Sequence, residues 1–190
     1  DKKLKESTRI LVTALLATLV VSHDGFQQIC TSFDFLKKVR LELETASSKR
    51  VQWLLLLVRR LFHLFSPEPS VFVSNGLHVQ AGLFITQRDP LTRAAAIGAL
   101  TSFLRPFECY VNVQLLLMCI PLFNDPSYLV RFHFLLMLKK FIISFDCYSD
   151  LLTPRSISLP MDSYQSILNF IFKCDNFQQS NIFTYIDDLV

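Results

Sequence analysis

The chain has 190 residues, enough for one well-buried domain. Hydrophobic residues make up 51% of it, with 18 Phe and only 4 Gly, which excludes disorder for most of the chain and favours helices. The formal net charge of +3 is small and the basic residues are scattered. That pattern is typical of solvated helix faces, so we expect no nucleic-acid binding.

The first part of the chain predicts helices separated by polar turns. Apolar residues recur at helical spacing, and polar clusters interrupt them. Ser47 or Ser48 is the N-cap candidate of the third helix, and Pro67 and Pro69 end it. The helices predicted here are residues 3–21, 26–44 and 49–65.

Residues 71–86 are ambiguous. Val71, Phe72 and Val73 favour a strand, and Gly76 and Gly82 each weaken a helix by about 1 kcal/mol. Because the segment lies directly before a turn that starts a helix, we interpret it as helical.

The second part continues the same pattern. Small residues in 91–104 allow a neighbouring helix to approach closely, and Pro121 should kink or end the helix that contains it. Residues 146–162, rich in Ser and Pro, are predicted to be a linker. The helices predicted in this part are 91–104, 110–123, 127–145, 163–174 and 177–190.

A sequence pattern that begins with an Asp-Pro pair occurs twice in the chain. When the Leu-x-Arg of each copy is aligned, Arg93 and Arg131 lie 38 residues apart (131 − 93), close to the roughly 40 to 47 residues of a HEAT or armadillo repeat. Asp accepts hydrogen bonds from first-turn amides and Pro suits the first helical position, so both pairs are expected to mark helix starts. The repeat-turn residues are Asp89, Pro90, Arg93, Asp125, Pro126 and Arg131.

The same residues suggest a ladder of Asp–Arg hydrogen bonds between successive units. Asp89 and Arg93 are four residues apart, whereas Asp125 and Arg131 are six apart. The ladder therefore fits only the second copy without adjustment.

These patterns predict an all-α fold, an α-solenoid of HEAT/armadillo-type helical repeats. We expect residues 1–145 to form about three helix pairs and 146–162 a linker. Residues 163–190 would add a further pair to the same solenoid.

No motif for catalysis, a cofactor or a metal ion emerges, and we expect the protein not to be an enzyme. The four His and five Cys share no metal-ligand spacing, and the dispersed Gly residues form no phosphate loop. Cys109 or Cys119 with His133 stays an open alternative as a nucleophilic pair. The unpaired, widely spaced cysteines suit a reducing compartment. No apolar run reaches the roughly 18 to 20 residues that span a membrane.

The order of several segments is more specific. STRILVTALLATLVVSHDGFQQIC is followed by VQWLLLLVRRLF, then by DPLTRAAAIGALTSFL, and then by NDPSYLVR, which opens a Phe-rich helix before the linker. This succession resembles the central armadillo-type solenoid of the Raptor family, the scaffold partners of the TOR kinase. In that family a long insertion, here shortened to 146–162, precedes a further helix pair.

The resemblance implies a non-catalytic scaffold in nutrient-responsive growth signalling. Its protein partners would be the helical repeats of TOR kinase and regulatory small GTPases. It would be cytoplasmic and recruited to lysosomal or vacuolar membranes. The family's caspase-like domain and propeller would lie outside this chain, which would be the middle of the protein. The alternative is another HEAT/armadillo adaptor, of a vesicle coat, nuclear transport or chromosome organisation. The sequence identifies no partner-binding residues.

Overall fold

The computed structural model describes residues 2–19, 33–65, 75–104 and 109–149. These residues form an all-helical fold without strands, as predicted. The elements are α1 (Lys2–Leu19), α3 (Phe33–Thr45), α4 (Ser48–Phe65), α6 (Leu77–Gly82), the 3-10 helix η1 (Leu83–Thr86), α7 (Pro90–Phe103), α8 (Cys109–Cys119), the 3-10 helix η2 (Ile120–Asn124) and α9 (Tyr128–Ser149).

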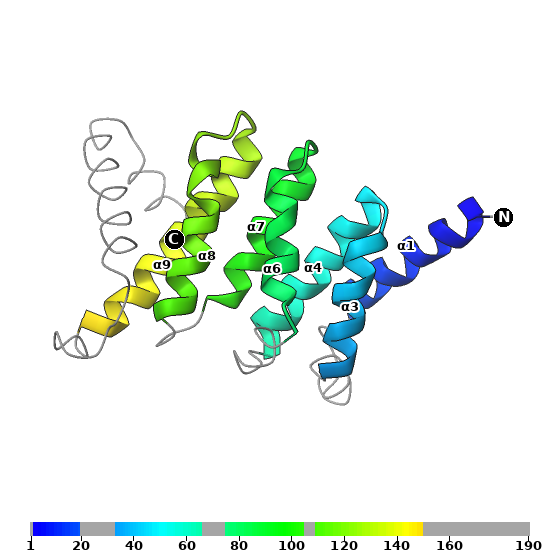
Figure 1. The fold of residues 1–190 in the computed structure, drawn as a ribbon, viewed down its shortest axis with the longest axis horizontal. Coiled ribbons are helices and arrows are strands. Elements are labelled where there is room, and N and C mark those ends of the chain that lie inside the picture. The colour runs from blue at the N-terminus through cyan, green and yellow to red at the C-terminus, as the bar shows by residue number, and fades with distance from the viewer. Residues whose placement is uncertain (1, 20–32, 66–74, 105–108, 150–190) are drawn as a thin grey trace.

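The helices form an elongated stack that follows chain order from α1 to α9 (Figure 1). One layer consists of α1, α4, α7 and α9, each packed along the next. The helices α3, α6 and α8 lie on the other side, where α3 contacts α6, α6 contacts α7 and α8 contacts α9. Consecutive helices thus alternate between the two layers from α3 onward.

The centre of the stack is α7, which packs against both α4 and α9. Its Ala94, Ala96, Gly98 and Ala99 are all buried. Side chains this small let two neighbouring helices approach closely, as expected from the sequence. Nearly every position of α7 beyond its first turn therefore faces protein.

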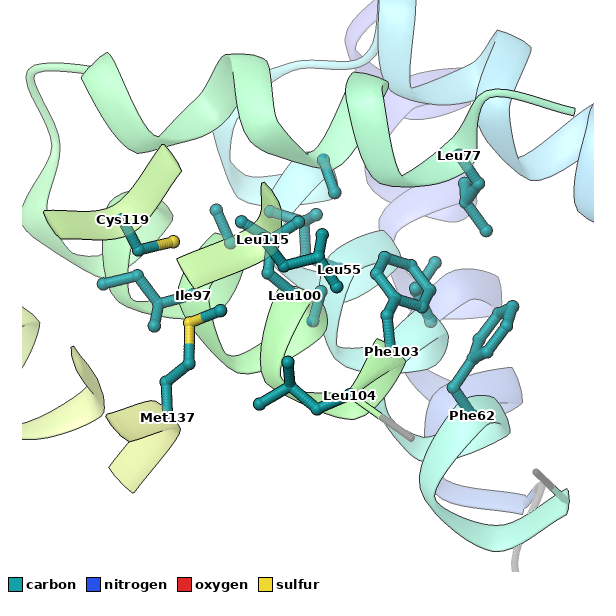
Figure 2. Packing of buried hydrophobic residues seen from close by; sticks show 14 of the residues in the cluster. Leu55, Phe62, Leu77, Ile97, Leu100, Phe103, Leu104, Leu115, Cys119 and Met137 are labelled. Atoms are coloured by element: carbon teal, nitrogen blue, oxygen red, sulfur yellow. The ribbon is translucent and has the colours of Figure 1, made fainter. Parts of the chain in front are cut away.

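Larger residues of the neighbouring helices fill the space around α7 (Figure 2). Phe62 of α4 and Phe103 of α7 are fully buried, and their ring centroids lie 4.6 Å apart at an interplanar angle of 86°. This edge-to-face geometry is favourable for aromatic pairs. Leu115 of α8 and Met137 of α9 extend the same core.

The ambiguous segment is helical over its described part, and the strand alternative is absent there. Gly76 does not interrupt the helix but precedes it, as the N-cap of α6 with a φ of 68° that favours glycine. Gly82 is the last residue of α6, and a Cβ there would lie 2.0 Å from the Met118 methyl carbon of α8. Glycine at 82 therefore brings α6 and α8 together.

The end of α8 confirms the effect predicted for Pro121. The α-helix stops at Cys119, and Ile120–Asn124 continue as the 3-10 helix η2 with the proline in its first positions. Proline lacks the N–H that an α-helix interior needs, so the backbone changes its hydrogen bonding here.

The predicted end of the following helix at residue 145 is wrong. The helix α9 continues to Ser149, so residues 146–149 are helical rather than part of the linker. They include no Gly or Pro, and nothing in them stops a helix. The rest of that linker, the helix pair at 163–190 and residues 26–32 of the helix predicted at 26–44 lie outside the described residues.

Truncating Phe103 to Ala should lower the free energy of unfolding by about 3–5 kcal/mol, because it leaves a cavity against Phe62. Urea denaturation followed by circular dichroism measures this loss. Leu83→Ala, at a side chain that is 58% exposed, is the control and should change stability by less than about 0.5 kcal/mol. Equal losses in the two variants would contradict the assigned core.

Candidate partner-binding surface

The turn before α7 is built around Asp89. Its carboxylate accepts hydrogen bonds from the backbone N–H groups of Leu91 at 3.3 Å and Thr92 at 3.0 Å, with Pro90 at the first helical position. The Thr92 hydroxyl also donates to it at 2.6 Å. This hydroxyl, with the two N–H groups and Gln52, keeps the pKa of the Asp89 carboxyl below its ordinary value of 3.8, although burial opposes them. Asp89 is thus the N-cap of α7.

The prediction that Asp125 and Pro126 start the next helix in the same way is wrong. The helix α9 begins at Tyr128, and Ser127 occupies the N-cap position. The carbonyl of Ser127 accepts the N–H of Arg131, as the carbonyl of Asp89 accepts that of Arg93. The two-residue offset between the copies explains the difference: aligning Arg93 with Arg131 places Ser127 opposite Asp89.

Asp125 instead joins the two units. The Arg93 Nε and Nη2 groups of α7 donate to its two carboxylate oxygens at 2.8 Å each, a bidentate ion pair. The backbone N–H of Ser127 donates to the same carboxylate at 2.8 Å. A hydrogen-bonded link between successive units therefore exists, but it runs from the arginine of the first copy to the aspartate of the second.

The two arginines occupy equivalent positions in their turns. The Nη1 group of Arg93 donates to the carbonyls of Gln87 and Arg88, and that of Arg131 to the carbonyls of Asp125 and Pro126. In each case the acceptors lie six and five residues earlier. Arg131 thus contacts the backbone of its own turn, and its printed hydrogen bonds do not include the Asp125 carboxylate expected from the sequence.

The Arg93–Asp125 pair is well shielded from water, with side chains only 11% and 6% exposed. Burial by itself would raise the pKa of the Asp125 carboxyl. The hydrogen bonds from Arg93 and Ser127 and the positive charges of Arg93 and Arg131 outweigh burial and lower the pKa below 3.8. The carboxylate therefore stays ionised at neutral pH.

A weaker link of the same kind joins α4 to the turn before α7. Gln52 Nε2 donates to the Asp89 carboxylate at 2.7 Å. Val51 holds the position in α4 that Arg93 holds in α7, because each donates the first backbone bond to its N-cap residue. Arg50 turns away and pairs with Glu42 of α3. An amide thus takes the place of an arginine at this junction.

A groove of about 570 Å³ opens where the later turns of α4, α7 and α9 meet. Arg59, Arg60 and His63 of α4 line one wall, and Lys140 of α9 lines the other. None of the described residues that line this space is acidic, and neither α4 nor α7 contains an Asp or Glu. We call it the basic groove.

The positions of the cations follow from the packing of α7. A Cβ at Gly98 would lie 3.3 Å from Arg59 Cδ and Nη1, so the glycine leaves room for the arginine to lie against α7. Arg60 donates to the carbonyl of Ala17 in α1, and Lys140 Nζ donates to the carbonyl of Thr101 at 3.0 Å. The cations of the basic groove are thus positioned by contacts with helices that are far apart in the sequence.

The pKa of His133 in α9 is lowered by its surroundings, which include Arg59. Burial, and then the positive charge of Arg59, lower the pKa of the imidazole below its ordinary value of 6.5. His133 is therefore neutral near pH 7. This proximity could not be predicted from the sequence, because the two residues lie on different helices of the stack.

Of the two cysteines considered for a nucleophilic pair with His133, the side chain of Cys109 lies outside the described part of the structure. Cys119 is buried, and burial raises the pKa of its thiol to about 12, so it is not a nucleophilic thiolate at neutral pH. Of the three histidines within the described ranges, only His63 lines the basic groove. Over the described ranges, no group of three potential ligands lies close enough to hold a metal ion, and no helix is long and apolar enough to cross a membrane.

A second surface feature lies on α1. Leu11, Val12 and Leu15 are 62%, 50% and 51% exposed, although they are large and apolar. They occupy neighbouring positions on one helix. Contiguous apolar patches on a surface are typical of sites that bind proteins, membranes or ligands.

Comparison with protein-family models, with curated proteins and with solved structures found no match to this chain.

Replacing Asp125 with Ala should cost about 3 kcal/mol of stability, because it leaves the Arg93 guanidinium shielded and without its carboxylate. Since folding lowers the pKa of Asp125, its stabilisation is present above about pH 4 and is lost as the pH falls through the folded value. Chemical denaturation over this acid range should show a smaller loss in Asp125→Asn than in the wild type. The exposed Arg40–Glu44 pair is the control, and Glu44→Ala should cost less than about 0.5 kcal/mol.

His133 should make the fold sensitive to mild acid. Its pKa is lowered on folding, so the unfolded chain binds the proton more tightly and stability rises with pH between the folded value and 6.5. Denaturation midpoints should therefore fall between about pH 7.5 and pH 5, and fall less in His133→Gln. An unchanged pH dependence in this variant would contradict the lowered pKa.

Proposed function

We propose that this chain is a HEAT/armadillo-type α-solenoid that acts as a non-catalytic scaffold, as the solenoid of the Raptor family does. In this proposal it binds TOR kinase and helps to recruit regulatory small GTPases and substrates in nutrient-responsive growth signalling. It would work in the cytoplasm and at lysosomal or vacuolar membrane surfaces.

The observation that carries the proposal is the repeated turn. Arg93 and Arg131 donate to backbone carbonyls at the same two offsets, and each stands four residues after the N-cap of its helix. A turn shared by successive helix pairs is typical of repeat proteins and supports the proposal. The order of the sequence segments, which resembles that of the Raptor family, is the reason for proposing this family.

The surface supports a binding role. Stacked helices present long faces, and here one carries grouped apolar side chains on α1 and another a groove lined by cations. Large protein interfaces combine such apolar centres with charged surroundings. Neither the apolar side chains nor the groove needs a catalytic group in order to bind a partner.

Binding to purified TOR kinase of the same organism tests the proposal. The full chain, immobilised on a biosensor, should bind the kinase saturably, with dissociation slowed by the apolar contacts. Leu11→Ser/Leu15→Ser should weaken binding by about tenfold or more if α1 contributes to the interface, because it removes exposed apolar area without touching the core.

A matched control is Leu83→Ser, which changes an equally exposed leucine on η1. Absence of kinase binding by the wild-type chain would refute the Raptor-like role. Binding instead to vesicle-coat subunits, nuclear cargo or chromosomal proteins would place the chain among other helical-repeat adaptors.

A further inference from the structure

The basic groove gathers the side chains of Arg59, Arg60 and Lys140 on the described surface. Arg59 is exposed and makes no hydrogen bond or ion pair within the described chain. Arg60, beside it, has a backbone carbonyl as its partner there rather than a carboxylate. Among the described residues, neither guanidinium group therefore has a carboxylate partner.

The glycine under Arg59 indicates that this arrangement is specific. Glycine inside a helix costs roughly 0.5–1 kcal/mol relative to alanine, and Gly98 stands in the middle of α7. A methyl group there would press on Arg59 at 3.3 Å. The space that the glycine leaves is the space in which the arginine lies, over the floor of the groove.

The lining also carries apolar groups. Leu56 of α4 and Leu136 of α9 face the same space as the cations. A volume of about 570 Å³ is within the roughly 300–1,000 Å³ of pockets that hold ligands. The groove therefore offers two chemistries at once, charge-assisted hydrogen bonds to anions and contact with apolar side chains.

We propose that the basic groove binds an acidic peptide segment of a partner protein, in which carboxylates alternate with apolar side chains. This deepens the proposed scaffold function and rests on it. Guanidinium groups match carboxylates in a bidentate geometry, and the leucines receive the apolar residues between them. The part of the lining that the structure describes contains no Phe, Tyr or Trp to stack on bases, so it favours a peptide over single-stranded nucleic acid.

Fluorescence anisotropy with the full chain and a short labelled peptide of alternating Glu and Leu tests this inference. The peptide should bind saturably and more weakly as salt is added. The same peptide with Gln in place of Glu should bind about tenfold more weakly or not at all. Equal binding of the two peptides would overturn the inference.

Arg59→Glu is the decisive variant, and Lys49→Glu is its control. Both residues are exposed on α4 and both changes alter the charge equally, but only Arg59 lines the groove. Reversing the charge at Arg59 should weaken the Glu–Leu peptide by about tenfold, and at Lys49 by less than about twofold. Equal weakening by both would show that only net charge matters and would overturn the inference.

Gly98→Ala tests the same site without changing charge. Its methyl group should displace Arg59 and weaken the peptide several-fold, but have little further effect when combined with Arg59→Glu. Additive effects would contradict a shared action through Arg59. Circular dichroism melting confirms that each variant is folded before binding is compared.

Competition separates the other anions. Single-stranded DNA or vesicles of anionic lipid that bind the groove more tightly than the peptide would overturn the assignment to an acidic peptide.

Kinase binding measured on the same variants separates the two proposals. A chain that binds TOR kinase but not the peptide refutes the groove inference alone. One that binds the peptide but not the kinase refutes the proposed function alone.

Discussion

The close approach of α4 and α9 to α7 is the constraint on which the rest of the described structure depends. The small side chains of Ala94, Ala96 and Ala99 allow the neighbouring helices to lie close to α7. Large residues of those helices, such as Phe62, therefore pack with α7 in one core. Gly98 is another of these small residues, but the space left by its missing side chain is occupied by Arg59 rather than by an apolar group. One run of small residues thus gives both the stack and its groove.

The turns fix how the units follow one another. An apolar core is tolerant of small shifts, whereas the bidentate pair of Arg93 and Asp125 requires one position of α7 relative to the turn before α9. Removing two charges from water offsets much of the attraction between them, so the pair contributes more to register than to total stability. At the preceding junction Gln52 makes a single bond to Asp89, which constrains the approach of α4 less tightly.

Local signals predicted most helix limits, because they act through neighbouring residues. Asp89 with Pro90 starts α7, and Pro121 ends the α-helical part of α8. The turn at Asp125 was misassigned because two cap-forming residues stand within three positions, and only the match of Arg131 to Arg93 decides between them. The groove was beyond sequence reasoning, since Arg59 and Lys140 are 81 residues apart (140 − 59) and meet only through α7.

The two arginine environments show which charges folding requires. Arg93 is nearly buried, and a shielded guanidinium is stable only because a carboxylate and two carbonyls surround it. Arg59 is exposed and hydrated, so it costs the fold little without a partner, and an uncharged residue would serve the core as well. Burial, and then the charge of Arg59, lower the pKa of His133. Because Arg59 is exposed and Arg93 is paired and nearly buried, the exposed arginine is the one that a partner can contact.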